Sequence, residues 1–119
     1  MTTPSDFARA LDDTNEIELT TTGQHSGRAR SRKVWFVQKH ETLYLLPVTG
    51  SESAWYGDVL ETPGVRLSAG QAQHDAEAKP IGDPAAVEQV VDDFLAKYGA
   101  HNIEAYYPKH DVAVEVPLA

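Results

Sequence analysis

The sequence predicts a mainly β (α+β) fold, a small antiparallel β-barrel of about six strands with an N-terminal helix and one long amphipathic helix. Three observations lead to this fold class. Most strand-like segments are short and are joined by connections of hairpin length, which favours antiparallel pairing over a parallel sheet. The clearest helical spacing of apolar residues lies in one long segment. The 119 residues, of which 41% are apolar, fit a single domain over residues 1–119.

A short helix is predicted near the start of the chain. Thr3, Pro4 and Asp6 have side chains that suit the N-cap, N1 and N3 positions, and apolar residues follow on one side. From residue 16 to residue 20 the apolar residues alternate with polar ones. This period of two predicts a half-buried strand after the helix.

The middle of the chain predicts two hairpins. The apolar run at residues 34–37 and the segment 43–46 are read as antiparallel strands joined by a tight connection at residues 40–42. Further along, residues 65–69 alternate in the same way and are expected to pair with residues 71–81 across a glycine turn.

Two helical segments and a last strand complete the fold. Residues 54–60 predict a short helical turn that carries two aromatic residues. The long helix begins at Asp83, a capping acid followed by proline, and stops at Gly99. Residues 112–116 return to a period of two, with valines facing one way, and predict the last strand.

Positive charge is concentrated in one stretch of an acidic chain. The formal net charge is -8, yet Arg28, Arg30, Arg32 and Lys33 lie close together. In an extended chain the three arginines point to one side, and their mutual repulsion indicates an anion that offsets it. A net anion is repelled by nucleic acid and by anionic membranes, so we expect neither as a partner. A small anionic molecule is the expected ligand.

The loop before these arginines suits a phosphate. Gly23 and Gly27 flank Ser26, so backbone N–H groups and a hydroxyl are available without obstruction by large side chains. A second reading stays open, in which the cations simply form ion pairs with acids elsewhere in the chain.

Other kinds of site have little support. The chain has no cysteine, its histidines lack the close spacing of a metal site, and no metal is expected. Ser26 lacks the strand-turn-helix context of a hydrolase nucleophile. No apolar run approaches the roughly 18 residues of a membrane helix and no leader pattern is seen, so we expect a cytoplasmic protein.

The loop and the segments after it also carry a recognisable pattern. It comprises Leu19-Thr20-Thr21-Thr22-Gly23-x-x-Ser26-Gly27-x-x-Arg30, a hydrophobic hairpin, Gly50, Trp55-Tyr56 and Pro63-x-Val65-x-Leu67. This pattern resembles the deazaflavin (F-420)-dependent nitroreductase family within the flavin-binding split β-barrel superfamily. The resemblance implies a split β-barrel.

The resemblance also implies a cofactor and its binding residues. Coenzyme F-420, a deazaflavin with an anionic phospholactyl-glutamate tail, would lie across the barrel, with the loop at its phosphate and the segment after the hairpin beside its ring. FMN is the alternative cofactor. The predicted cofactor-binding residues are Ser26, Gly27, Arg28, Arg30, Lys33, Gly50, Trp55 and Tyr56. For the two aromatic residues, packing in the core or at the end of the barrel is an equal alternative.

Three functions therefore remain open. The first is a deazaflavin-dependent oxidoreductase that transfers hydride to a quinone, a nitro compound or an activated alkene, with no side chain singled out as catalytic. The second is a non-catalytic barrel that binds a flavin-like or other anionic small molecule, and the third is an interaction domain without a ligand. Gln24-His25 stands where nitro-reducing members carry Arg-Lys, and Asp58 where they carry asparagine. The Gln24-His25 pair favours the second function. Many split barrels are dimers, so a homodimer is one expectation.

Overall fold

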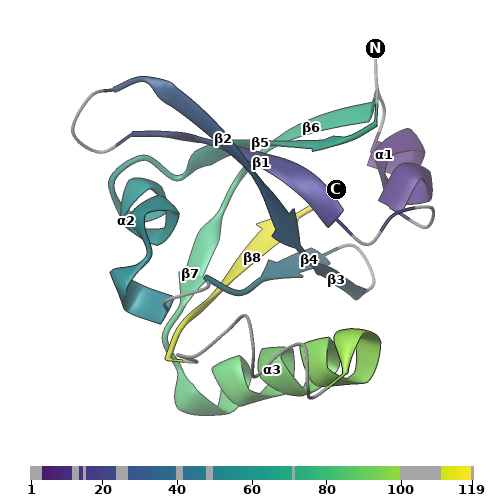
Figure 1. Ribbon diagram of the computed structural model, residues 1–119. Helices are drawn as coiled ribbons and strands as arrows, with labels where there is room; N and C mark the ends of the chain where they lie inside the picture. The colour runs from purple at the N-terminus through teal and green to yellow at the C-terminus, as the bar shows by residue number, and fades with distance from the viewer. Residues whose placement is uncertain are drawn as a thin grey trace.

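The computed structural model describes residues 4–11, 14, 16–23, 27–39, 42–47, 50–70, 72–99 and 111–118. These residues form two four-stranded antiparallel sheets and three α-helices (Figure 1). The first sheet has the order β2-β1-β5-β6, with β1 (Glu16–Thr22), β2 (Ala29–Trp35), β5 (Gly64–Ala69) and β6 (Ala72–Glu77). The second sheet has the order β3-β4-β8-β7, with β3 (Val37–Lys39), β4 (Thr42–Leu45), β7 (Lys79–Ile81) and β8 (Ala113–Pro117). The helical elements are α1 (Pro4–Leu11), the 3-10 turn η1 (Gly50–Glu52), α2 (Ala54–Glu61) and α3 (Pro84–Tyr98).

The two sheets close into a barrel through two corners. The chain passes from β2 to β3 at Phe36 and from β6 to β7 at Ala78, and both corner residues are buried. Strands that change sheet at a bend are the usual way to make such a corner. When the two segments at each corner are counted as one bent strand, the eight described segments form six strands, two of them bent, so the predicted barrel of about six strands is confirmed.

The strand predicted at residues 34–37 is wrong as a single element. Val34 belongs to β2 and pairs with Ile17, whereas Val37 begins β3 and pairs with Tyr44. The predicted alternating segment 71–81 is interrupted in the same way at its corner residue. A bend that keeps apolar side chains buried on both sides leaves the apolar pattern unchanged, so the corners carry no signal in the sequence.

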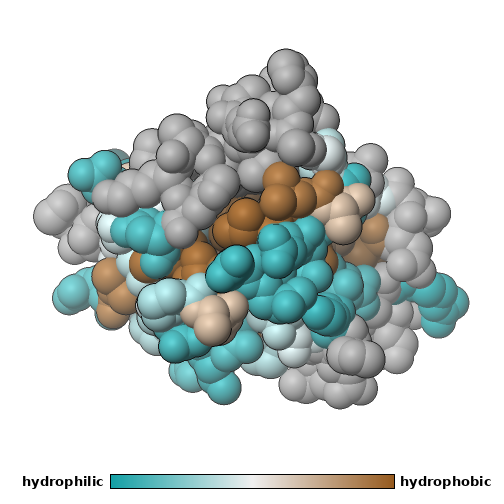
Figure 2. Space-filling model, turned by 90° about the horizontal axis from the view of Figure 1, so that it is seen from below, coloured by the Kyte–Doolittle hydropathy of each residue, from teal (hydrophilic) through white to brown (hydrophobic). Residues whose placement is uncertain are grey.

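The main core fills the space between the sheets, and a second cluster lies beneath α3. Asp83 begins α3 as predicted, because its carboxylate accepts a hydrogen bond from the amide of Ala86 at 3.0 Å. Gly99 ends the helix with a φ of 89°. The helix buries the second cluster against the outer face of the second sheet; its buried members are Val37, Leu46, Val87, Val90, Phe94 and Ala113. Figure 2, seen from below, shows a hydrophobic band beside hydrophilic side chains on this end of the molecule.

Strand β8 has buried residues on both of its faces. Val114 and Val116 point into the main core, as the predicted last strand requires, and Ala113 belongs to the cluster beneath α3. The predicted N-terminal helix is confirmed as α1, whose Phe7 stacks on His74 of β6, while the proposed capping residue Thr3 lies outside the described residues. None of the helices in the described part of the chain is long and apolar enough to cross a membrane.

Candidate functional site

Two backbone hydrogen bonds join the two ends of the connection between β1 and β2. The amide of Gly23 donates to the carbonyl of Arg28 at 2.8 Å, and the amide of Gly27 donates to the carbonyl of Gly23 at 2.9 Å. Gly27 has a φ of 68°, which favours glycine, and a Cβ built there would meet nothing within 4 Å. Ser26, predicted at the phosphate, lies outside the described residues, as does the Gln24-His25 pair.

Four polar side chains meet where this hairpin passes α2. Arg30 Nη2 lies 2.7 Å from Asp58 Oδ2, which also accepts a hydrogen bond from Thr21 Oγ1 at 2.9 Å. Arg32 Nη1 donates to the same threonine oxygen at 3.1 Å. The alternation along β2 therefore brings two of the three predicted arginines to one side, as expected. We call Thr21, Arg30, Arg32 and Asp58 the hairpin cluster.

Asp58 is the centre of the hairpin cluster. Helix α2 turns Trp55, Tyr56, Asp58 and Val59 to its buried side, and Asp58 is 0% exposed. A buried carboxylate needs a partner, because the loss of its hydration is expensive. Arg30, whose side chain remains 45% exposed, supplies the opposite charge. The alternative prediction, that the cations form ion pairs with acids elsewhere in the chain, is therefore confirmed for Arg30.

The electrostatics of the hairpin cluster leave positive charge at its surface. Burial lowers the pKa of Arg32, the nearby Arg30 lowers it further, and Asp58 acts in the opposite direction. Arg28, which precedes β2, is exposed. Two guanidinium groups near one carboxylate leave a net positive charge, which can attract an anion from solution.

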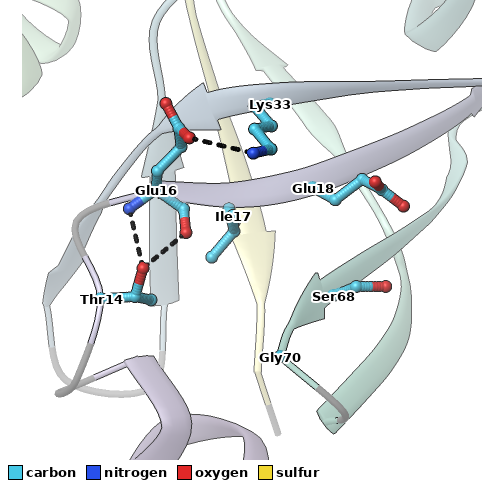
Figure 3. A pocket seen from close by; sticks show the side chains of 7 residues that line it. All are labelled: Thr14, Glu16, Ile17, Glu18, Lys33, Ser68 and Gly70. Atoms are coloured by element: carbon cyan, nitrogen blue, oxygen red, sulfur yellow. Dashed lines mark hydrogen bonds and ion pairs between the residues drawn. The ribbon is translucent and has the colours of Figure 1, made fainter.

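Lys33 is not brought together with the arginines. It lies on the opposite face of β2 and lines a cavity of about 330 Å³ with Thr14, Glu16, Glu18 and other residues (Figure 3). Its Nζ is 3.9 Å from Glu16 Oε1, and the hydroxyl of Thr14 donates to the Glu16 carbonyl at 2.8 Å. Two glutamates at this cavity make it a poor place for an anion.

The remaining predicted residues lie next to the hairpin cluster in the chain. Gly50 is buried and opens η1, and the following Ser51 amide donates to Asp111 Oδ1 at 2.9 Å. Trp55 and Tyr56 are 5% and 7% exposed and belong to the main core, which is the packing role that the sequence left open. Burial raises the pKa of Tyr56, and Asp111 raises it further. Contact with a cofactor ring stays a prediction for both aromatic residues.

Sequence reasoning missed the roles of Asp58 and Thr21. The available signal was the position of Asp58 three residues after Trp55, which places an acid on the apolar side of a short helix. Thr21 gave no such signal, because threonine is common in strands. Only the fold brings it to Asp58, 37 residues further along the chain.

One protein family matches most of the chain. It is described as "Uncharacterized protein conserved in bacteria (DUF2255)", and its model matches residues 8–114. No curated protein matches the chain.

Several solved structures share the fold. An F420-H2 dependent reductase, FDR-A, is 19% identical with a TM-score of 0.67, covering 86% of this chain and 93% of that chain. A FAD-binding protein from Mesorhizobium loti is 12% identical with a TM-score of 0.69, covering 97% and 88%. A chain described as a domain-swapped dimer is 17% identical with a TM-score of 0.68, covering 96% and 99%. At these identities the likeness shows the fold, and the predicted split barrel is confirmed.

Proposed function

The chain belongs to the DUF2255 family and folds as a split barrel, and we propose that it is an oxidoreductase that binds coenzyme F-420 at the β1–β2 hairpin. The proposed reaction is hydride transfer to a quinone, a nitro compound or an activated alkene. The reduced deazaflavin supplies the hydride when bound, so the chain's own residues need only bind, orient and shield. The similarity in fold to an F420-H2 dependent reductase supports this choice.

The observation that carries the proposal is the gathering of Arg30 and Arg32 beside an open glycine turn. Guanidinium groups form charge-assisted, often bidentate hydrogen bonds to phosphate. Arg30 is 45% exposed although one of its nitrogens contacts Asp58. Gly27 leaves open space beside the backbone, which a phosphate needs to approach. The chemistry of these donors fits the anionic tail of F-420.

The position of α2 supports a ring site next to this phosphate site. Asp58 ties α2 to β2, so the helix that carries Trp55 and Tyr56 lies beside the hairpin (Figure 1). We propose that the deazaflavin ring lies along this helix while its tail reaches Arg28, Arg30 and the loop. The buried side chains of Trp55 and Tyr56 then hold the helix in place and exclude water from the core side of the proposed ring site.

Titration of the protein with each cofactor tests the proposal. We expect F-420 to bind more tightly than FMN, measured by fluorescence quenching of each, because the charges of its phospholactyl-glutamate tail are spread along the tail and can meet different arginines. Arg32→Gln should weaken F-420 binding about tenfold. Arg66→Gln is the matched control, since Arg66 is an exposed arginine paired with Asp75 on β6. Tighter binding of FMN would move the assignment to flavin, and binding of neither would contradict the function.

A second candidate is a barrel that carries the same cofactor without turnover. Gln24-His25, in place of the Arg-Lys of nitro-reducing relatives, is the feature that favours it. Absorbance of reduced F-420 followed in the presence of menadione separates the two candidates. Oxidation that requires the protein supports the oxidoreductase, and tight binding without oxidation supports the carrier.

We also propose that the chain forms a homodimer. The support is the similar fold of a chain described as a domain-swapped dimer, which this chain matches over almost its whole length. Analytical ultracentrifugation should give a mass of twice 13.0 kDa. A monomer at all concentrations would contradict this proposal without affecting the cofactor site.

A further inference from the structure

We propose that Asp58 makes the hairpin site select a singly charged phosphodiester over a doubly charged terminal phosphate. The inference rests on the proposed function and deepens it, because it names the charge state of the ligand's phosphate and the residue that sets it. F-420 carries a phosphodiester in its tail, whereas FMN ends in a terminal phosphate.

The geometry makes Asp58 an internal counter-ion. Its carboxylate is 0% exposed, so no ligand reaches it, yet it lies 2.7 Å from a guanidinium that is half-exposed. Thr21 extends this contact to Arg32, since its hydroxyl donates to Asp58 and accepts from Arg32. One fixed negative charge therefore lies directly behind the donors that face a ligand.

The charge balance of the site follows from these contacts. Arg30 and Arg32 bring two positive charges to the hairpin cluster, and Asp58 cancels one of them. Lys33 adds nothing here, because it lies on the other face of β2 beside Glu16. The field that a bound phosphate meets is therefore that of about one net positive charge, although the sequence groups four cations in this stretch.

The attraction of a doubly charged phosphate to such a site is too weak to offset the cost of removing that phosphate from water. The cost of removing an ion from water grows with the square of its charge, whereas its attraction to fixed charges grows only in proportion. A terminal phosphate carries a charge of about -1.5 to -2 near pH 7, and a diester carries one charge. The carboxylate behind Arg30 also repels the second charge, so the diester is preferred.

Two flavins that differ only at the phosphate provide the test. FMN has the terminal phosphate, and riboflavin cyclic phosphate is its internal diester with the same ring and ribityl chain. We expect the cyclic ester to bind about tenfold more tightly to the unaltered protein, by fluorescence titration at pH 7.5 and fixed salt. In Asp58→Asn the affinity for FMN should rise more than that for the cyclic ester, so that the ratio falls to about one.

Asp75→Asn is the matched control for the change in charge. Asp75 forms an ion pair with Arg66 at 2.7 Å, as Asp58 does with Arg30, but on the exposed surface of β6. Asp75→Asn changes the net charge of the protein by the same amount as Asp58→Asn does. We expect this control to leave the ratio of the affinities for the cyclic ester and FMN unchanged. Circular dichroism verifies that each variant is folded. If Asp58→Asn does not fold, the comparison of the two flavins on the unaltered chain decides alone.

The results separate the inference from the proposed function. Equal or tighter binding of FMN by the unaltered protein would overturn the inference, as would equal changes in the ratio for the two variants. If F-420 binds and neither flavin does, dimethyl phosphate and inorganic phosphate replace them as competitors against F-420, with the diester expected to compete better. If F-420, FMN and riboflavin cyclic phosphate all fail to bind, the proposed function itself is contradicted.

Discussion

The hydroxyl of Tyr98 bonds to both backbone polar groups of Phe36, accepting from its amide at 3.1 Å and donating to its carbonyl at 2.7 Å. Phe36 is the corner between β2 and β3, where the ladder of sheet hydrogen bonds is interrupted. The ammonium group of Lys97 donates to the same carbonyl at 2.8 Å and lies 3.7 Å from the centre of the Phe36 ring. The end of α3 thus supplies the hydrogen bonds that a neighbouring strand supplies elsewhere.

Removing this hydroxyl should destabilise the domain. Tyr98→Phe keeps the ring that stacks on Trp35 at 4.5 Å but leaves the Phe36 amide without its partner. We expect a loss of about 2 kcal/mol in the free energy of unfolding, measured in urea. Tyr44→Phe is the control, since Tyr44 packs against the same cluster beneath α3. Equal losses in both variants would contradict the role given to the hydroxyl.

Alkaline unfolding should also depend on Tyr98. Burial raises the pKa of Tyr98 from 10.0 to about 12, so the folded state keeps the phenol proton more firmly than the unfolded state does. The resulting stability is fully present below pH 10 and is lost as the pH rises toward about 12. The loss should be about 1 to 2 kcal/mol, allowing for the exposed part of the ring. Urea titrations at pH 9 and pH 11.5 should show a steeper fall in the unaltered protein than in Tyr98→Phe.

The ion pair between Arg30 and Asp58 should contribute more to the free energy of unfolding than an exposed ion pair does. Arg30→Gln removes the guanidinium that contacts the buried carboxylate of Asp58, and we expect a loss of about 2 kcal/mol in the free energy of unfolding. A double-mutant cycle with Asp58→Asn should recover a coupling energy of about 1 kcal/mol or more. The cycle on Arg66 and Asp75 should give about 0.5 kcal/mol or less, because both side chains are more than half exposed. Indistinguishable coupling energies would argue against a special role for Asp58.

The N-cap of α3 gives a simpler prediction. Asp83→Ala removes the acceptor of the Ala86 amide and should cost about 1 kcal/mol. Asp92→Ala, an exposed substitution within the same helix, should change thermal stability by much less. A similar fall in melting temperature for both variants would show that the cap contributes little.

The elements that could be predicted from the sequence are those with local signals. In β1 buried and more exposed residues alternate strictly. Helix α3 begins at Asp83, whose side chain caps it, and ends at Gly99, whose backbone is free to adopt a positive φ. Both elements can therefore be predicted from short stretches of sequence. The corners at Phe36 and Ala78 could not be predicted, because each buried corner residue continues the inward alternation of the strand before it and so leaves the pattern of apolar residues unchanged.

The site was only partly predictable for a related reason. The alternation of Arg30 and Arg32 along one side of β2 is a local property, and the structure confirms it. The partner of Arg30 is not local, since Asp58 lies 28 residues away and meets it only after α2 packs against the hairpin. Lys33 is adjacent to Arg32 in the chain, and the same alternation that brings the arginines together places Lys33 on the opposite face.

The central position of β8 affects how the nascent chain folds on the ribosome. β8 lies between β4 and β7, and Leu45 is paired with Val114, so the second sheet is divided until residues 113–117 have been synthesised. Until then β4 and β7 present open strand edges, which promote aggregation. Pairing over such a long stretch of chain is also slow. We therefore expect a nascent chain that is stalled before β8 to need a chaperone, even though its first sheet can already form.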